Sequence, residues 1–399
     1  MEIKTTEYTS IDIPRIEEEI YLETEKYLQI YPLDEKTYKL CMQGYVGALK
    51  LTKTCTLYSY PKVGISNVLR MFDYSTRKFQ TRDQILRFDE EANFLDLLAR
   101  IFIQEVETIC RTAYRRFYSP RIENLLTIKG KILVSETILQ NRFLPYVTCE
   151  YQDFTDDILE NRIFKYATYL QLKAFAGNKD KKQLYHKLRN LYSFFDNVKL
   201  VMIPPQIIDK MTYDRLNRKY EKAHYISRFF LEYLYISHGF GESSFYSFMI
   251  DMEKLFEDFV REIIKTFNKK YITTKGSNYL DITRSYVKLK PDIIMKQNGK
   301  TKLVLDCKYK KVRKIPEDYG VELAKPYPSD VYQMLSYMVA YECPKGVLIY
   351  PKGECEDLDI QIMVESRHYV IHVKQIDLMR LEEDFLRDFS LSMDNYVIK

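Results

Sequence analysis

Two aspartates and one lysine are the side chains of this sequence whose types and spacing could do chemistry. Asp292 begins one β-rich run, and Asp306 and Lys308 lie in the run that follows it. Because side chains alternate between the two faces of a strand, Asp306 and Lys308 project together from a run that is otherwise apolar. A carboxylate and an ammonium group in such a strand cost free energy unless they are paired or bind a metal ion. The sequence therefore predicts a polar site around these three side chains.

A divalent cation suits this site, because two converging carboxylates raise each other's pKa unless a cation neutralises them. Mg²⁺ prefers oxygen ligands and keeps several waters, so it can activate water and offset the charge of a phosphorane. We therefore predict Mg²⁺-dependent phosphodiester hydrolysis. The predicted ligands are Asp292, Asp306 and the backbone carbonyl of Cys307. Lys308 is predicted to orient or deprotonate the water and to stabilise the same charge.

The register of the two strands decides whether the aspartates can meet. Asn298-Gly299 between two β-rich runs indicates a hairpin. A plain two-residue turn would pair Asp292 with Leu305 and leave Asp292 on the wrong face. A three-residue loop, one β-bulge, or an equivalent bend before Asp292 would instead bring it opposite Asp306. The metal-site hypothesis requires that shift.

The order Pro-Asp292, then Asp306-x-Lys308 across a hairpin resembles the PD-(D/E)xK nuclease superfamily. Members often add a metal-site glutamate from the helix before the hairpin. A helix is predicted over 251–267, and Glu253 and Glu257 lie at one edge of its apolar stripe. The resemblance implies a catalytic and metal-binding role for Glu257, with Glu253 in reserve. The alternative is that Glu257 only pairs with the arginine at i+4.

A second helix is predicted after the hairpin, beginning near Pro328, and it places Gln333 and Tyr337 on one face. Superfamily members often carry a QxxxY pair here that reaches DNA or the attacking water, which implies an assisting catalytic role for Gln333. The alternative is that Gln333 closes a capping box on Asp330, and both roles can hold together. His368 and His372 could share a strand face, but they lack a visible third ligand and are expected to be structural.

Composition and charge exclude several classes of protein. The net charge of +5 permits nucleic-acid binding without demanding it. Seven cysteines without a CxxC pair argue against zinc and suit a reducing compartment. No signal peptide, membrane span or Gly-rich phosphate loop is visible. We therefore expect a soluble, cytoplasmic protein, without a membrane partner, that does not hydrolyse nucleotides by itself.

The chain predicts an α/β fold, α+β overall, in three domains. Residues 1–120 mix strand and helix signals and form an N-terminal α+β domain for partner binding; residues 121–245 read as a mainly helical middle region; residues 246–399 form a nuclease-like mixed sheet flanked by helices. Paired strands are expected over 45–51 and 54–61, a further strand pair around 125–134, and helices over 93–114, 156–175 and 215–236.

Several ordered motifs together resemble the McrC family, the nuclease subunit of McrBC-type modification-dependent restriction systems. They lie at residues 47–63, 128–137, 149–165, 252–260, the hairpin, and 330–341. The resemblance implies a type IV-like restriction endonuclease subunit that uses Mg²⁺, with Asp292, Asp306 and Lys308 in the catalytic positions.

The resemblance also implies a partner: a hexameric AAA+ GTPase, McrB, which hydrolyses GTP, translocates double-stranded DNA and recognises modification such as 5-methylcytosine. The N-terminal part would insert into the ring's pore and stimulate hydrolysis, with residues 47–61 and the segment up to Arg121 as candidates. Two alternatives stay open. A stand-alone nuclease would cut DNA without any partner. If the chain is instead a non-catalytic adaptor, DNA cleavage by the complex would persist after Asp306 is replaced.

Overall fold

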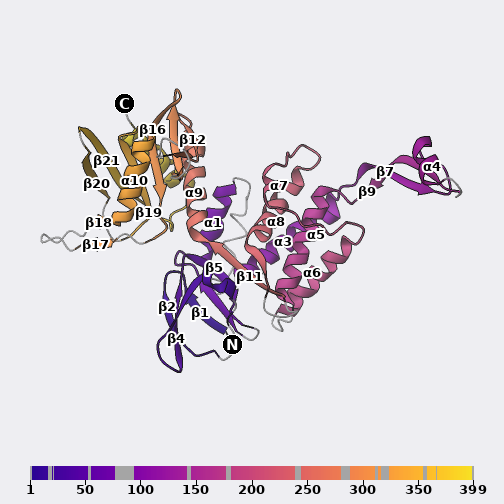
Figure 1. Ribbon diagram of the computed structural model, residues 1–399, viewed down its shortest axis with the longest axis horizontal. Coiled ribbons are helices and arrows are strands. Elements are labelled where there is room, and N and C mark those ends of the chain that lie inside the picture. Colours follow the sequence, from indigo (N-terminus) through magenta and orange to yellow (C-terminus); the bar gives the residue numbers. More distant parts are fainter. Residues whose placement is uncertain are drawn as a thin grey trace. The chain divides into compact units, whose positions relative to one another are not determined.

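The computed structural model describes residues 2–16, 20, 22–52, 55–76, 94–141, 145–176, 181–238, 244–279, 288–310, 313–315, 323–353, 357–364 and 366–397. The chain divides into two compact units, whose elements are labelled in Figure 1. Unit 1 joins Met1–Ala92 to Met249–Lys399, and unit 2 is Asn93–Phe248. The mixed α and β class expected from the sequence is confirmed, whereas the boundaries at 120 and 245 differ from these units.

Short strands dominate the start of unit 1. One group contains β1 (Glu2–Thr6), β6 (Thr56–Tyr60) and β5 (Tyr45–Lys50), with β6 parallel to β1 and antiparallel to β5. A second, antiparallel sheet has the order β2 (Ser10–Pro14), β4 (Thr37–Met42), β3 (Leu28–Pro32), and the 3₁₀ helix η1 (Leu22–Lys26) precedes β3. The strand pair expected over 45–51 and 54–61 is therefore confirmed.

The first 92 residues share a core with the C-terminal part through two helices. These are α1 (Ile65–Thr76) and α9 (Met252–Phe267). The Tyr74 ring meets Phe259 edge to face, with centroids 6.0 Å apart. Phe72 and Phe259 are both buried. Burial of the apolar face of α1 on α9 is the physical reason why residues 1–92 do not stand apart as their own compact unit.

A six-stranded mixed sheet forms the centre of the C-terminal part. Its order is β12 (Ile272–Thr274), β15 (Ile293–Gln297), β16 (Lys300–Cys307), β19 (Lys345–Pro351), β21 (Arg367–Ile376), β20 (Leu358–Val364). β16, β19 and β21 are parallel, and the outer pairings are antiparallel. Short ladders join β13 (Asn278–Tyr279) to β14 (Lys288–Leu289) and β17 (Arg313–Ile315) to β18 (Leu323–Lys325).

Helices cover both faces of this sheet. α10 (Pro328–Ala340) links β16 to its parallel neighbour β19, and Met334 and Met338 pack in one buried cluster with Val304 and Leu348. On the opposite side of β16, Tyr309 contacts Phe256 of α9, with ring centroids 5.6 Å apart. α11 (Glu383–Ser392) packs along α9 and is followed by η4 (Met393–Tyr396). The predicted helices on either side of the hairpin are thus confirmed.

Unit 2 has a helical body with an aromatic core. Its helices are α3 (Phe94–Thr112), α5 (Leu159–Phe175), α6 (Lys182–Phe194), α7 (Gln206–Asp209), η3 (Arg218–Tyr220) and α8 (Glu221–Tyr233). The Phe102 ring lies edge-on to both Phe164 and Phe230. β10 (Leu234–His238) then pairs antiparallel with β11 (Ser244–Asp251). The three helices expected from periodicity are present.

A β-rich arm projects from this body (Figure 1). It consists of β7 (Phe117–Leu125), β8 (Lys131–Ile132), α4 (Val134–Gln140) and β9 (Val147–Thr155). β7 and β8 both pair with β9 and not with each other, so the strand pair expected around 125–134 was wrong. Gly130 has φ = 72°, and a Cβ there would lie 2.5 Å from the Glu150 carbonyl oxygen, which explains the glycine.

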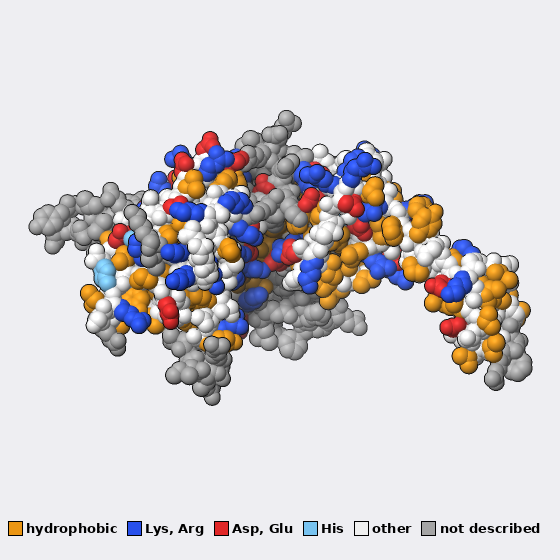
Figure 2. Space-filling model, turned by 90° about the horizontal axis from the view of Figure 1, so that it is seen from above, with side chains coloured by type: hydrophobic (Ala, Val, Ile, Leu, Met, Phe, Trp, Pro, Cys, Tyr) orange, Lys and Arg blue, Asp and Glu red, His pale blue; other side chains and the backbone are white. Residues whose placement is uncertain are grey.

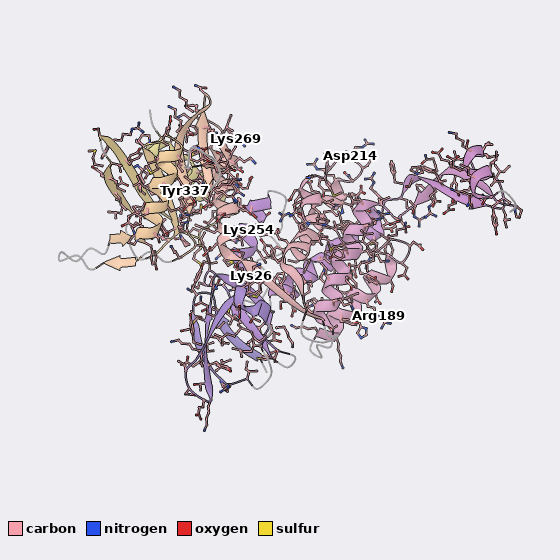
Figure 3. The ribbon with its side chains drawn as sticks, in the orientation of Figure 1. Lys26, Arg189, Asp214, Lys254, Lys269 and Tyr337 are labelled. Carbon is pink, nitrogen blue, oxygen red and sulfur yellow. The ribbon has the colours of Figure 1, made fainter. Side chains whose placement is uncertain are left out.

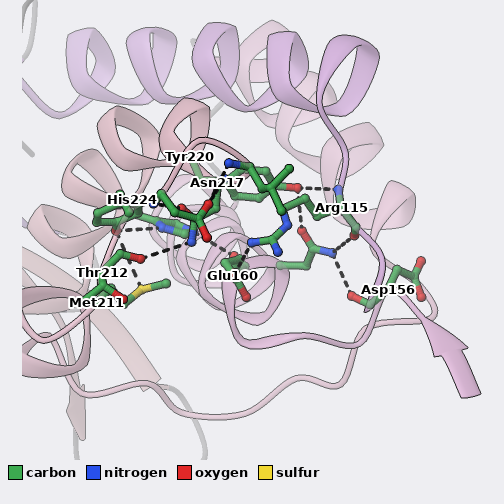
Figure 4. Close-up of polar contacts among 12 residues, drawn as sticks. Arg115, Asp156, Glu160, Met211, Thr212, Asn217, Tyr220 and His224 are labelled. Atoms are coloured by element: carbon green, nitrogen blue, oxygen red, sulfur yellow. Dashed lines mark hydrogen bonds and ion pairs between the residues drawn. The ribbon is translucent and has the colours of Figure 1, made fainter. Parts of the chain in front are cut away.

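Buried polar contacts fasten the base of the arm to the helices (Figure 4). The Tyr220 hydroxyl accepts from the Arg115 backbone N–H at 2.8 Å and donates to Asn161 Oδ1 at 3.2 Å. His224 Nε2 lies 3.0 Å from the Glu160 carbonyl oxygen, and its Nδ1 lies 3.0 Å from the Tyr213 hydroxyl. A carbonyl can only accept, so the neutral ring carries its proton on Nε2.

Candidate active site

The hairpin contains the register shift that the site requires. Asn298 and Gly299 have φ of 51° and 75°, the positive values of a type I′ turn. Gln297 pairs with Lys300 across that turn, but the ladder slips between Met295 and Lys296, so that Lys302 is an extra residue. Beyond this bulge Ile293 pairs with Leu305. The next positions, Asp292 and Asp306, therefore face each other, which confirms the geometric expectation.

Asp292 is held by the neighbouring strand. Its Oδ2 accepts a hydrogen bond from the Cys307 backbone N–H at 2.8 Å. Burial, followed by the charges of Asp306 and Glu257, raises the pKa of Asp292 to about 9, although the Cys307 N–H acts in the opposite direction. Repulsion between the carboxylates favours the protonated form of Asp292, and a cation bound between them would displace that proton. The side chain thus has the electrostatics of a cation ligand.

Asp306 lies deeper, with 2% of its surface exposed. Lys308 Nζ lies 2.7 Å from Asp306 Oδ2. This charged hydrogen bond and the Coulomb attraction of Asp306 both raise the pKa of Lys308. A carboxylate has about four lone-pair sites on its two oxygens, so one contact with an ammonium leaves others able to bind a cation. A buried carboxylate oxygen with unused lone pairs fits a hard divalent cation.

Lys308 connects the aspartates to α10. Its Nζ donates to Gln333 Oε1 at 2.8 Å, and Gln333 Nε2 donates to the Tyr337 hydroxyl at 2.9 Å. Figure 3 shows Tyr337 on α10, beside the sheet. Burial acts to lower the pKa of Lys308, but Asp306 and the other carboxylates raise it above its usual value. The amine is therefore a cation here, suited to stabilising negative charge more than to removing a proton.

The paired side chains of Gln333 and Tyr337 are thus brought to the site, as their spacing predicted. Neither side-chain group of Gln333 is used as a helix cap in these contacts, and α10 has Tyr327 at its N-cap. Asp330 is buried and accepts from Lys310 Nζ at 2.8 Å and from the Tyr350 hydroxyl at 2.6 Å. The capping-box alternative is therefore not what the structure shows.

Glu257 and Glu253 occupy different surroundings. Burial and the Asp306 charge raise the pKa of Glu257, while Lys275 and a hydrogen bond with Asp292 lower it. Lys275 Nζ lies 3.5 Å from Glu257 Oε2. Glu253 is exposed and accepts from the Tyr8 hydroxyl at 2.7 Å. Of the two glutamates, only Glu257 adjoins the aspartates.

The alternative partner of Glu257 was the arginine at i+4. That residue, Arg261, instead pairs with Asp258. His372 on β21 has its Nδ1 2.7 Å from Asp359, and its ring is tilted against that of Tyr396, with centroids 4.3 Å apart. His368 is exposed on the same strand. The structure therefore leaves both histidines out of the carboxylate site.

The residues present fit a cation that keeps much of its water. Among the described residues, no three His, Cys, Asp or Glu side chains form a ready-made metal-binding group. The two facing aspartates bring carboxylate oxygens together, and Glu257 adjoins them. Mg²⁺ is commonly held by one or two carboxylates and several waters, so this set is sufficient for it. The Cys307 carbonyl and Glu257 stay predicted ligands.

Strand alternation places Lys310 on the face of Asp306 and Lys308, and the structure brings it to Asp330 beside the site. Two further groups, Tyr350 and Lys275, were missed in the sequence analysis, because they come from distant strands and loops. Both join the site only through tertiary packing.

Fold and site together define an α+β protein whose mixed sheet carries two facing aspartates and a lysine. The family model described as "McrBC 5-methylcytosine restriction system component" matches residues 40–351. The chain belongs to this family, which confirms the resemblance seen in the sequence motifs.

Individual relatives are similar to this chain at low identity. The type IV methyl-directed restriction enzyme EcoKMcrBC of Escherichia coli is 23% identical over 311 residues, which cover 73% of this chain and 86% of that protein. A chain of the Thermococcus gammatolerans assembly of McrB AAA+ hexamers with bound McrC aligns over 99% of this chain and 100% of its own, with a TM-score of 0.61 and 17% identity. A second chain, from the McrBC complex of the same organism, aligns over 68% and 89% with a TM-score of 0.46 and 19% identity.

Within the described residues, none of the helices combines the length and the apolar character needed to cross a membrane.

Proposed function

We propose that this chain is the DNA-cutting subunit of a McrBC-type restriction system and hydrolyses phosphodiester bonds with Mg²⁺. One observation carries the proposal. The β-bulge in the hairpin brings Asp292 opposite Asp306, and Lys308 lies 2.7 Å from Asp306. Two carboxylates with a lysine at the end of adjacent strands form a set suited to metal-assisted attack on a phosphate.

Each side chain has a defined part in this chemistry. Asp292 and Asp306 would hold Mg²⁺, which supplies an activated water and neutralises charge on the phosphate. Lys308 points its ammonium at the same space and stabilises the negative charge that develops there. Gln333 keeps that ammonium in place through its 2.8 Å hydrogen bond. Glu257 and the Cys307 carbonyl would supply further oxygen ligands to the ion.

A partner is part of the proposal. The Thermococcus assembly consists of McrB AAA+ hexamers with bound McrC, and we propose a similar hexameric GTPase as the partner of this chain. That partner would select methylated double-stranded DNA and hydrolyse GTP. Residues 47–61 and the segment up to Arg121 stay the predicted pore contacts, and we add the arm of unit 2 as a partner surface. The apolar side chains of the arm are unusually exposed (Figure 2): Ile122, Leu126, Ile128, Val134, Ile138 and Leu139.

The decisive test is Asp306→Ala in the complex reconstituted from the full chain and its cognate GTPase. Cutting of 5-methylcytosine DNA in Mg²⁺ is expected to fall at least about 100-fold, because a metal ligand and the charge beside Lys308 are both lost. The matched control is Asp384→Ala, whose side chain is 95% exposed and lies 3.9 Å from its Arg387 partner. Undiminished cutting by Asp306→Ala would show an adaptor that only stimulates the ring.

The same preparation tests the stand-alone alternative. The wild-type chain alone is expected to cut poorly, because DNA selection and delivery belong to the ring. Full activity of the isolated chain on unmodified DNA, without GTP, would instead establish a nuclease that needs no motor.

A further inference from the structure

A buried glutamate near the N-terminus reaches the strand end that carries Lys308. Glu7 is completely buried, and its Oε1 accepts hydrogen bonds from the Tyr309 hydroxyl and from the Lys62 backbone N–H, both at 2.9 Å. Tyr309 is itself buried and directly follows Lys308. The N-terminal segment thus grips the chain one residue beyond the proposed catalytic ammonium.

Tyr309 is one of the anchors that fix the chain where it leaves the sheet. The ladder between β16 and β19 ends at Cys307. The Lys308 backbone N–H donates to the Ile349 carbonyl at 2.8 Å, and the Lys308 carbonyl accepts from the Lys310 N–H at 2.9 Å. Between these two bonds, the Tyr309 ring packs on Phe256 and its hydroxyl donates to Glu7. The side chain of Tyr309 therefore helps to set the path of the chain directly after Lys308.

The chemistry of Glu7 indicates more than packing. Among the described residues, its second oxygen, Oε2, has no hydrogen-bond partner although it is buried. Burial raises the pKa of Glu7, against the opposing effects of Lys62 and Tyr309. An apolar residue of similar volume would fill this space at lower cost. A hydrogen bond, unlike an apolar contact, fixes a direction, and here the direction is that of Tyr309.

We propose that Glu7 is a positioning residue for Lys308. Its hydrogen bond to Tyr309 holds the end of β16 in one conformation. That conformation keeps the ammonium between Asp306 and Gln333, where it meets the phosphate. The inference rests on the proposed function, since it concerns the same catalytic site, but it assigns a part of that site to the N-terminal segment.

Three substitutions test the hydrogen bond in the reconstituted complex. Tyr309→Phe and Glu7→Leu are expected to lower kcat for DNA cutting about fivefold to tenfold, the effect of one buried hydrogen bond, with KM for DNA unchanged. Glu7→Gln keeps an acceptor oxygen for the Tyr309 hydroxyl, so its kcat is expected to stay within about twofold of wild type. Rescue by the amide distinguishes positioning from loss of charge.

The matched control is Tyr213→Phe, which removes a half-buried tyrosine hydroxyl that lies 3.0 Å from His224 Nδ1 in unit 2. It is expected to lower thermal stability without lowering kcat. Equal losses of kcat in Tyr309→Phe and Tyr213→Phe, or a loss in Glu7→Gln as large as in Glu7→Leu, would overturn the inference.

Asp306→Ala separates this inference from the proposed function. If Asp306→Ala abolishes cutting while Tyr309→Phe leaves kcat unchanged, the positioning role fails and the nuclease assignment stands. If Asp306→Ala still cuts, both fail together.

Discussion

Asp292 and Asp306 face each other inside the protein, and each has a different neutralising group. Lys308 lies beside Asp306, whereas Asp292 accepts from the Cys307 N–H, has a hydrogen bond with Glu257 and has a raised pKa. Without a cation, one of the two carboxyl groups keeps its proton, because two adjacent negative charges would repel each other. A bound cation would replace that proton, so binding of Mg²⁺ and folding stability are linked.

Mg²⁺ is therefore expected to stabilise the isolated chain. At a Mg²⁺ concentration about 100-fold above Kd, the gain in unfolding free energy is about 2.7 kcal/mol. The measurement is the melting temperature with EDTA and with Mg²⁺, for wild type, Asp306→Asn and the exposed-site control Asp384→Ala. Wild type and Asp384→Ala should shift and Asp306→Asn should not. An equal shift in all three proteins would place the ion elsewhere.

The buried side chain of His224 is expected to make the stability of the chain depend on pH. Burial lowers its pKa to about 3, below the value near 6.5 of an unfolded chain. The unfolded state then binds more protons, so stability is full above about pH 6.5 and is lost as pH falls toward 3, by at most about 1.4 kcal/mol per unit. The urea midpoint of wild type should fall more steeply than that of His224→Gln between about pH 7.5 and about pH 5.5. Parallel declines would show that His224 is not responsible.

At the scale of elements, the hairpin shows what sequence reasoning can and cannot reach. Asn298-Gly299 predicted the turn, because both residues tolerate positive φ. The proposed chemistry implied a register shift in this hairpin. The sequence could not show that the bulge lies at Lys302, because its position depends on pairing along the whole ladder. The arm was missed for a related reason. β7 and β9 are joined by contacts across more than twenty residues, and their exposed apolar side chains mask the alternation that marks a half-buried strand.

Gly276 packs against Pro291, the residue that precedes Asp292 at the start of the hairpin. Its backbone N–H donates to the Pro291 carbonyl at 2.9 Å, and an added Cβ would lie 2.4 Å from Pro291 Cγ and 2.7 Å from Ile294 Cδ1. The proline ring cannot rotate away, so Gly276→Ala must move the residue next to Asp292. We expect a loss of about 1–3 kcal/mol in stability and reduced cutting at saturating DNA.

The control for this change is Gly353→Ala, where the nearest atom to an added Cβ is Gln375 Oε1 at 3.4 Å. Its melting temperature and cutting rate should match wild type. Normal activity of Gly276→Ala, measured beside this control, would show that the position of Pro291 is not critical to the site.

At the scale of the whole molecule, the chain returns to its first unit after an insertion. Residues 1–92 and 249–399 form one compact unit, with Asn93–Phe248 inserted between them. Local patterns located the long helices α3, α5, α8, α9 and α10 and the β15–β16 hairpin, because amphipathic periodicity and turn chemistry depend on neighbouring residues. They could not show that α1 packs on α9 or that Glu7 meets Tyr309, since those contacts join residues far apart in the sequence.

The exposed apolar side chains of the arm are expected to contribute to binding of the GTPase ring. Ile128 and Leu139 are 66% and 76% exposed on it, more than folding requires of large apolar residues. Ile128→Asp with Leu139→Asp is expected to leave the melting temperature of the chain unchanged and to weaken binding to the GTPase ring at least about 10-fold, because charged groups would be desolvated in an apolar contact. Size-exclusion chromatography and GTP hydrolysis by the ring measure the effect.

Leu216→Asp is the matched control, because Leu216 is 67% exposed in unit 2 but lies outside the arm. It should bind the ring and stimulate GTP hydrolysis as wild type does. If the arm variant still assembles and stimulates normally while Leu216→Asp does not, the partner surface lies on the helical body. Loss confined to the arm variant, together with an intact Mg²⁺-dependent thermal shift, would show that docking and catalysis occupy separate units of the chain.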